Sequence, residues 1–374
     1  MMWRLCAATA VGVWLAWHAA RAWGDEPAAE EKNAKGEKSS EPRLSLFDVP
    51  SPTFGGMQFW SDELVHHDWR IQRNVVTGHC RLLDDQNFRH AWGSYDDCRQ
   101  AFDALKEANQ LPPVNGKVVI VLHGLVGTRF AMTDLCRHLH DKGEYTPINV
   151  SYASTRGSLA DHAASLAKVI QNLDGATEID FVAHSLGNLV LRHYLADQTN
   201  PEKNLRPDAR IKRIVMLAPP NNGATLAVRF KDQKLLEVVL GQSAKQLAAE
   251  GPKICNRLAT PPCEFAIIAG GQGDDDGINP LINGDDDLVV SVAETRLPGA
   301  RDFAVLPIIH RKMSCDPTVC EYTLRFLQHG YLVSEEQRQP ITADVAAAVG
   351  DEPRSTKTKS SAKRRAERDA EQKR

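Results

Sequence analysis

Residues 178–195 constrain the fold of this chain more than any other stretch. Residues 178–184 form a short β-type run, and from Leu186 onward apolar residues recur every three or four positions, as on a buried helix face. The pattern predicts a strand that turns abruptly into a helix, with Ser185 at the corner. Such a corner holds a serine hydroxyl clear of the sheet and directs the first amides and the positive dipole end of the helix toward it.

The residues around Ser185 leave two interpretations open. Ala183 and Gly187 are small enough for the close packing that a sharp strand-to-helix turn requires, which favours a nucleophile. A serine that precedes a helix also serves as an ordinary N-cap, so the pentapeptide alone does not separate the two roles. The distinction depends on whether partner groups occur at suitable places elsewhere in the chain.

The rest of the chain alternates between strand-like and helix-like segments. The continuous β-branched run at residues 117–122 is typical of a strand buried on both faces of a parallel sheet. Further strands are predicted at 146–152, 211–218, 265–269 and 303–308, and helices at 129–142, after Ser158, after Ser185, and at 318–330 with Thr318 as its cap. This order predicts an α/β fold in which one doubly wound, mostly parallel sheet has helices on both faces.

The segment before this alternation has a different pattern. Residues 47–83 contain strand-like stretches near 58–60, 69–73 and 79–83, which predict a small antiparallel start. Ser94 and Asp97 have the spacing of a capping box and predict a helix that ends before the next prolines.

Both ends of the chain have the composition of segments outside the folded domain. Residues 1–22 combine a positive start, a short apolar run and an A-x-A site, which predicts a secretory signal peptide and an exported protein. Residues 23–43 predict a disordered linker, and residues 351–374 a disordered basic tail. The α/β domain then spans residues 44–350, and its residues 221–263 predict either a cap or lid or an ordinary surface helix pair.

Charge and cysteine usage narrow the classes of function. Without the leader, linker and tail, the core has a net charge of about −9, which argues against nucleic acid as a partner. Cys136 is expected to be a buried apolar residue, and no Cys/His spacing predicts a metal site. The other cysteines of the mature chain lie in near-neighbour pairs that predict disulfides: Cys80 with Cys98, Cys255 with Cys263, and Cys315 with Cys320.

A serine nucleophile needs a histidine base, an acid that orients the histidine, and two amides for the oxyanion. After the predicted strand at residues 117–122 the chain continues through His123 and Gly124. Gly124 permits a sharp turn that leaves the Leu125 amide free to donate. The Leu186 amide, next to the serine, is the second expected donor. His310 follows the last predicted strand and is the expected base.

Two adjacent residues compete for the role of the acid. Asp287 stands directly before the apolar run 288–290 and is preferred, and Asp286 is the alternative. The chain order Ser185, Asp287, His310 is that of α/β-hydrolases and differs from the orders in the two large serine-protease folds. The acidic loops at 274–276 and 285–287 also suit Ca2+ by composition, although a solvated loop without an ion is the expectation.

Several segments in this order resemble the lipase and esterase branch of the α/β-hydrolase superfamily, in particular bacterial triacylglycerol lipases with an A-H-S-x-G elbow. The segments are 121–127, 181–187, 219–223, 285–292 and 306–310. The chain departs from that family at Ala183 and Leu288, where the family usually has glycine. The resemblance implies an α/β-hydrolase fold, an ester or lipid substrate, lipid-surface contact through the lid, and ester hydrolysis through an acyl-enzyme without an organic cofactor.

Two other functions are compatible with the same motifs. An acyltransferase would use the same triad with an alcohol other than water as acceptor, and the products formed with excess acceptor would reveal it. A non-catalytic envelope protein would keep the fold for binding only, since a fold does not fix a function. The presence of every triad member argues against that last function, while the oligomeric state is left open.

Overall fold

The computed structural model describes residues 51–52, 56–203, 206–223, 255, 257–274 and 277–343, all within one compact unit, Ser45–Arg374. The predicted leader, linker and basic tail lie outside these residues, as does the centre of the predicted cap at 224–254. Within them, no helix combines the length and the apolar character that a membrane crossing requires.

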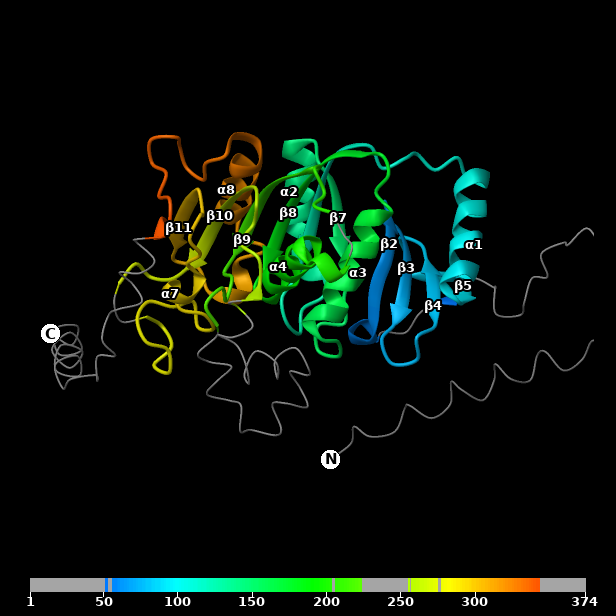
Figure 1. Cartoon of the computed structure of the whole chain (residues 1–374), viewed down its shortest axis with the longest axis horizontal. Helices are drawn as coiled ribbons and strands as arrows, with labels where there is room; N and C mark the ends of the chain where they lie inside the picture. Colours follow the sequence, from blue (N-terminus) through cyan, green and yellow to red (C-terminus); the bar gives the residue numbers. More distant parts are fainter. Residues whose placement is uncertain are drawn as a thin grey trace, which may run out of the picture. The chain divides into compact units, whose positions relative to one another are not determined.

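Six parallel strands form the central sheet, in the order β7-β6-β8-β9-β10-β11 (Figure 1). The strands are β6 Gly116–Leu122, β7 Thr146–Val150, β8 Ala176–His184, β9 Ile211–Leu217, β10 Glu264–Gly270 and β11 Asp302–Leu306. The chain enters at β6, moves outward to the edge strand β7, returns past β6 to β8, and then proceeds strand by strand to β11. The predicted doubly wound sheet is confirmed.

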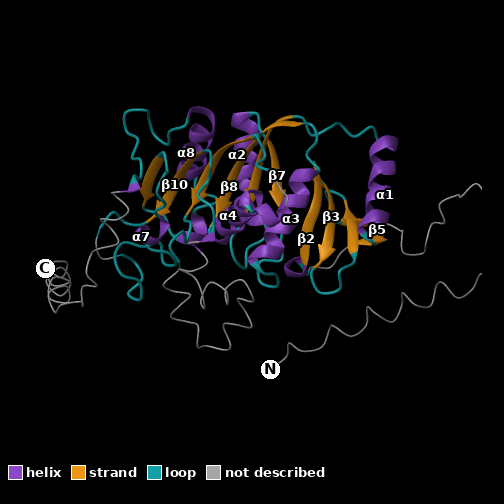
Figure 2. Ribbon diagram, in the orientation of Figure 1, coloured by secondary structure: helices purple, strands orange, loops and turns teal. Residues whose placement is uncertain are grey.

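Helices cover both faces of this sheet (Figure 2). They are α2 Thr133–Gly143, α3 Leu159–Gln171, α4 Leu186–Thr199 and α8 Pro317–His329. The α3 and α4 side chains share one apolar cluster with Ile120 and Leu122 of β6, and those of α2 and α8 share another with Val119 and Val121. Because alternate β6 residues enter opposite layers, the strand is apolar at all of its buried positions, Val118 to Leu122.

A second, antiparallel sheet precedes the first, with the order β1-β5-β4-β3-β2. Its elements are β1 Ser51–Pro52, β2 Trp60–His66, β3 Trp69–Asn74, β4 Cys80–Leu83 and β5 Phe88–Gly93, followed by α1 Tyr95–Ala108. The strand predicted near 58–60 is wrong: left-handed Gly56, with φ 79°, turns the chain into a 3-10 helix at Met57–Phe59, and β2 begins after it. The predicted capping box of Ser94 and Asp97 is present at the start of α1.

The two sheets are joined through a buried carboxylate on β2. Asp62 accepts hydrogen bonds from Arg70 and Gln72, each at 2.7 Å, and from the Ser151 amide beyond β7, also at 2.7 Å. The Asp62 amide donates in turn to the Ser151 carbonyl at 2.9 Å. The hydrogen bonds to Asp62 replace the hydration that its buried carboxylate has lost, and together they fix the strands relative to each other.

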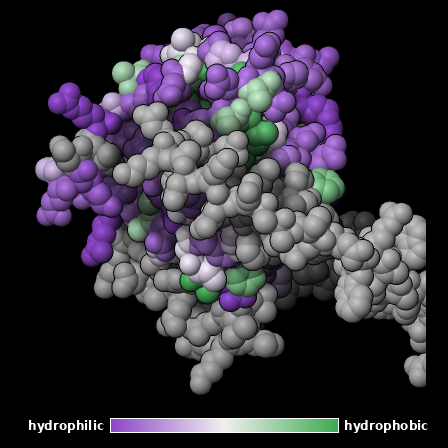
Figure 3. All heavy atoms as spheres, turned by 90° about the vertical axis from the view of Figure 1, so that its right-hand side faces the viewer, coloured by the Kyte–Doolittle hydropathy of each residue, from purple (hydrophilic) through white to green (hydrophobic). Residues whose placement is uncertain are grey.

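On the side of α1 and β5, the described surface is mostly hydrophilic with small apolar patches (Figure 3).

The predicted disulfides are not formed in the described part of the chain. Every predicted pair contains at least one free thiol: Cys80, Cys255, Cys263, Cys315 and Cys320 are all free. Closeness along the chain does not bring two sulfurs to the distance and angle of a disulfide. Cys80, Cys255, Cys263 and Cys320 pack among apolar groups, while the Cys315 sulfur contacts the Lys312 carbonyl. Burial raises the pKa of Cys80 to about 11 and that of Cys320 to about 12, so both are protonated at neutral pH. Cys136, expected to be buried, is partly buried against the α2 and α8 layer.

Asp180 on β8 makes the stability of the fold depend on pH. It is fully buried, and burial raises its pKa from 3.8 to about 7. Between these values the folded protein keeps a proton that the unfolded chain has lost, so the free energy of unfolding falls as the pH rises. Above about pH 7 the carboxyl is ionised in both states, and the loss of stability is complete. We expect Asp180→Asn, which cannot ionise, to raise the melting temperature relative to wild type more at pH 8 than at pH 5.

The control for this prediction is Asp174→Asn, because Asp174 is exposed. Thermal melts of this variant are expected to differ from wild type equally at both pH values. An Asp180→Asn effect that is likewise independent of pH would contradict the assignment of the titration to Asp180.

Candidate active site

The carboxyl ends of β6 and β8 form the point at which the chain reverses its direction across the sheet. After β6 the chain moves to β7, and after β8 it moves the opposite way to β9. In open parallel sheets, ligands bind at such a switch point, because the two connections leave a crevice between them. His123 and Gly124 follow β6 there, and Ser185 follows β8.

Ser185 is held in a strained corner between β8 and α4. Its φ of 52° and ψ of −119° lie outside the common regions for an L-residue, which costs on the order of 1–3 kcal/mol. The Ser185 amide donates to the Leu217 carbonyl at 2.9 Å, which anchors the corner to β9. A Cβ on Gly187 would come within 2.9 Å of Leu122, and one on Gly124 within 3.1 Å of the Ser185 Cβ. These two glycines therefore let the serine corner and the turn after β6 approach each other.

One imidazole connects the serine with a carboxylate. His310 Nε2 lies 2.9 Å from Ser185 Oγ, and His310 Nδ1 lies 2.7 Å from Asp287 Oδ2. Because a carboxylate only accepts, Nδ1 holds the proton and Nε2 is left to accept from the serine hydroxyl. The His310 amide also donates to the Asp287 carbonyl at 2.9 Å. The structure thus brings together the three residues that the sequence predicts as a triad.

The carboxylates of Asp286 and Asp287 are both fully buried but bind different groups. Asp287 Oδ1 accepts from the amides of Val289 and Val290 at 3.0 and 2.8 Å, which leaves Oδ2 for the imidazole. Asp286 accepts from the amides of Asn279 and Leu288, the shortest contact being 2.7 Å. Asp286 therefore stabilises its own loop, while Asp287 faces the histidine.

The predicted oxyanion donors are the amides of Leu125 and Leu186. Leu125 lies in the turn after β6, which is closed by a hydrogen bond of 3.1 Å from the Gly127 amide to the Gly124 carbonyl. Leu186 is the first residue of α4, and the first amides of a helix have no acceptor within it. Across the described residues, neither amide donates to another group. Both are available to a negatively charged oxygen.

Two further histidines beside the site are neutral. His184 donates from Nε2 to the His310 carbonyl at 3.0 Å, and burial together with the neighbouring imidazole of His310 lowers the His184 pKa to about 3. His123 donates from Nδ1 to the Gly124 carbonyl at 2.8 Å, and burial lowers its pKa to about 4. At neutral pH these rings therefore add no positive charge that would oppose protonation of His310.

The acidic loops form no cation site in the described part of the chain. Asp285 accepts from the amides of Gln272 and Gly273 at 2.6 and 2.8 Å, and residues 286–287 also bind backbone amides. No cluster of three His, Cys, Asp or Glu suited to a metal occurs among the described residues, and residues 275–276 lie outside them. The expectation of a solvated loop is wrong for residues 286–287, because their carboxylates turn inward to these amides and are fully buried.

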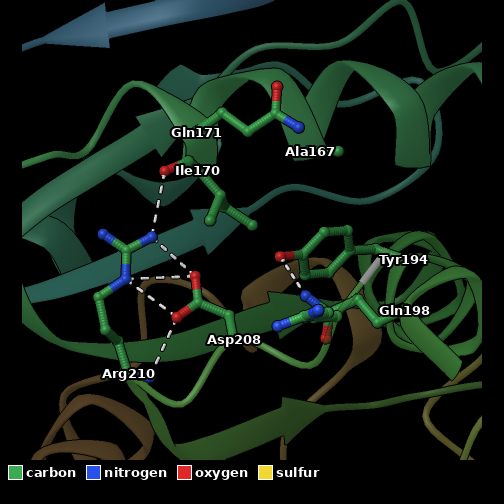
Figure 4. A pocket seen from close by; sticks show the side chains of 8 residues that line it. Ala167, Ile170, Gln171, Tyr194, Gln198, Asp208 and Arg210 are labelled. Carbon is green, nitrogen blue, oxygen red and sulfur yellow. Dashed lines mark hydrogen bonds and ion pairs between the residues drawn. The ribbon is translucent and has the colours of Figure 1, made fainter. Parts of the chain in front are cut away.

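A surface pocket lies elsewhere, between α3, α4 and the segment before β9 (Figure 4). Its polar side chains satisfy one another: Arg210 binds Asp208 at 2.7 Å, and Gln198 donates to the Tyr194 hydroxyl at 2.6 Å. Arg210 directly precedes β9, so the pocket is at the amino ends of the strands, opposite the edge that holds Ser185. The pocket is therefore separate from the candidate active site.

The strand order, the two helix layers and the serine corner at the switch point define the architecture. The chain has the α/β-hydrolase fold. A family model described as a domain of unknown function, DUF7379, matches residues 87–259. No curated protein sequence matches the chain.

Solved structures that resemble the chain include lipases and a phospholipase. The mature Bacillus licheniformis lipase BlEst2 is 17% identical with a TM-score of 0.42, and the match covers 58% of this chain and 92% of that one. The Legionella pneumophila phospholipase PlaB is 16% identical with a TM-score of 0.43, covering 62% of each chain. The Staphylococcus hyicus lipase is 11% identical with a TM-score of 0.42, covering 54% and 90%.

Sequence reasoning missed the support of the turn after β6. The Tyr152 hydroxyl donates to the His123 carbonyl, and the two rings stack with centroids 4.2 Å apart and planes inclined by 7°. In the sequence, Tyr152 only ends a predicted strand, so no pattern marks it. Gln58, in the 3-10 helix before β2, also supports this turn, because it donates to the Val126 and Gly127 carbonyls. In the sequence it only begins a strand-like stretch, so no pattern marks it either.

Proposed function

We propose that this protein is a serine hydrolase of carboxylic esters, of the lipase and esterase type, with Ser185, His310 and Asp287 as its triad. The single observation that supports this most strongly is the His310 ring, which spans from Ser185 Oγ at 2.9 Å to Asp287 Oδ2 at 2.7 Å. This geometry makes the serine a nucleophile, since its proton has an acceptor whose tautomer is held by the carboxylate.

In the proposed reaction, Ser185 Oγ attacks the ester carbonyl carbon while its proton passes to His310 Nε2. The carbonyl oxygen becomes an anion that accepts hydrogen bonds from the Leu125 and Leu186 amides. The His310 imidazolium, stabilised by Asp287, then gives its proton to the departing alkoxide, and an acyl-enzyme on Ser185 remains. Water deprotonated by His310 then attacks the acyl carbon. The bond from that carbon to Ser185 Oγ breaks, the carboxylic acid leaves, and the proton on His310 returns to Oγ.

The surface beside the site supports an apolar acyl group in the substrate. Met57 and Phe59 from the N-terminal 3-10 helix are 38% and 37% exposed, and Val126 and Phe130 from the loop after β6 are 48% and 51% exposed. The two segments are linked by hydrogen bonds from Gln58 to the Val126 and Gly127 carbonyls, so these side chains border the same loop. Exposed apolar side chains on the two segments that meet at the turn after β6 suit contact with an acyl chain or lipid.

The proposal is tested by the hydrolysis of p-nitrophenyl esters of increasing acyl length, with and without emulsified triglyceride. Release of p-nitrophenol that requires Ser185 supports the proposal, and the length series identifies the acyl preference. Purified protein that cleaves none of these substrates and takes no acyl label would contradict it.

We also propose that the protein is exported, on the basis of residues 1–22 alone. N-terminal sequencing of the mature protein should then begin close to Ala22. Recovery of the intact leader in the soluble cell fraction would contradict export.

A further inference from the structure

A single glutamine outside the parallel sheet contacts the loop that follows β6. Gln58 Nε2 donates to the Gly127 carbonyl at 2.8 Å and to the Val126 carbonyl at 3.2 Å. Its Oε1 accepts from the Ser154 hydroxyl at 3.1 Å and from the Thr155 amide and hydroxyl at 3.3 and 3.1 Å. The side chain thus joins the loop after β6 to the loop after β7.

Only one orientation of the Gln58 amide satisfies these neighbours. The Val126 and Gly127 carbonyls can only accept, and the Thr155 amide can only donate. If the amide were reversed, its oxygen would face two carbonyl oxygens and its nitrogen would face an N–H group. A side chain with both Nε2 hydrogens and its oxygen used in this way is held in one position, although it is only partly buried.

The loop that Gln58 holds is strained. Val126 has a φ of 61°, in the left-handed region. For a β-branched residue this conformation is an outlier, and it persists only where the surroundings enforce it. The Gln58 bonds to the carbonyls of Val126 and of Gly127 supply that enforcement from outside the turn. Leu125, the expected oxyanion donor, is the residue directly before Val126.

We infer that Gln58 is a positioning residue for the oxyanion turn, and hence that the 3-10 helix that leads into the N-terminal antiparallel sheet is part of the catalytic apparatus. The inference rests on the proposed ester-hydrolase function. Gln58 fixes the positions of the Val126 and Gly127 carbonyls. Because Leu125 directly precedes Val126, this keeps the Leu125 amide directed toward the reacting carbonyl. Gln58 also lies outside residues 87–259, the part matched by the family model, so that part alone lacks this support.

The test compares Gln58→Met with the matched variant Gln72→Met. Gln72 lies on β3 of the antiparallel sheet that follows the Gln58 helix, and it binds Asp62 and Arg81, so its contacts are within that sheet and not with the turn. Each variant is assayed on an ester and on the corresponding thionoester, in which sulfur replaces the carbonyl oxygen. Since an oxyanion accepts stronger hydrogen bonds than a sulfur anion does, misplaced donors slow the ester more than the thionoester.

For Gln58→Met we expect ester kcat to fall about 10- to 100-fold with little change in KM, and the ester to thionoester rate ratio to fall with it. Gln72→Met should lower the melting temperature and leave the ratio as in wild type. An equal loss on both substrates in Gln58→Met, or an unchanged ester rate, would overturn the inference. Gln58→Glu serves as a second variant of similar shape, because it replaces the two donors by acceptors and should show the same loss.

Hydrogen exchange separates this inference from the proposed function, because it requires no substrate. The amides of residues 124–129 should exchange faster in Gln58→Met than in wild type, while Gln72→Met should leave them unchanged. Unchanged exchange in Gln58→Met would overturn the inference even in an active esterase. Faster exchange in a protein without esterase activity would support the role of Gln58 in holding the turn and contradict the proposed function alone.

Discussion

Replacing Ser185 with alanine is expected to remove ester hydrolysis almost completely, with a loss approaching the roughly 10⁶-fold that follows removal of a triad serine. The reason is the 2.9 Å contact between Ser185 Oγ and His310 Nε2, through which the proposed base would take the proton of the proposed nucleophile. Alanine has no atom that attacks the carbonyl, so neither the acyl-enzyme nor a covalent phosphonate adduct can form. Activity on a p-nitrophenyl ester and labelling by a fluorophosphonate measure the two consequences separately.

A second serine provides the control for that experiment. Ser314 is buried and its hydroxyl donates to the Ala131 carbonyl at 2.8 Å, so it supports the structure without facing a base. Ser314→Ala should lower the melting temperature slightly and keep both activity and labelling. Labelling that persists in Ser185→Ala would show that a different serine is the nucleophile. The Ser185 variant should also melt close to wild type, because alanine keeps the Cβ and the same backbone conformation at the corner.

The main features of the fold follow from local patterns in the sequence. The β6 run of residues 117–122 is apolar at every position that the structure buries, because both faces of a parallel strand are covered by helices. The capping boxes at Ser94 and Ser158 are present as predicted, since they depend only on residues three apart. The corner at Ser185 is likewise local, because the strand and the helix on its two sides carry different periodicities.

Other features were not predicted correctly, one of them local and the rest dependent on contacts that sequence spacing does not fix. The last helix begins at Pro317 with Asp316 as its cap, where Thr318 was predicted, because proline lacks an N–H and fits the first helical position. The predicted disulfides are not formed, because the spacing of two cysteines in the sequence does not fix the distance and angle between their sulfurs. The role of Gln58 could not be predicted, because it binds the backbone carbonyls of Val126 and Gly127, and a carbonyl is present whatever the side chain.

Asp287→Asn is expected to lower kcat by about 10⁴-fold while leaving the fold intact. Asp287 Oδ1 binds two backbone amides, and an asparagine oxygen can keep those bonds. The asparagine NH2 would then occupy the place of Oδ2, which accepts from His310 Nδ1 at 2.7 Å. Two donors cannot pair, so the imidazole would change tautomer and place its proton on Nε2, where it no longer accepts from Ser185.

Asp286→Asn is the matched comparison, because it makes the same chemical change one residue earlier. The Asp286 carboxylate accepts from the Asn279 and Leu288 amides and so holds the loop rather than the base. We expect this variant to lose stability, measured by thermal melting, with a reduction in kcat far smaller than that of Asp287→Asn. The loop also contains Leu288 in a left-handed conformation with φ 85°, so any loss should be structural and shared by all substrates. If Asp286→Asn instead has the 10⁴-fold effect and Asp287→Asn keeps its activity, Asp286 orients the histidine during turnover.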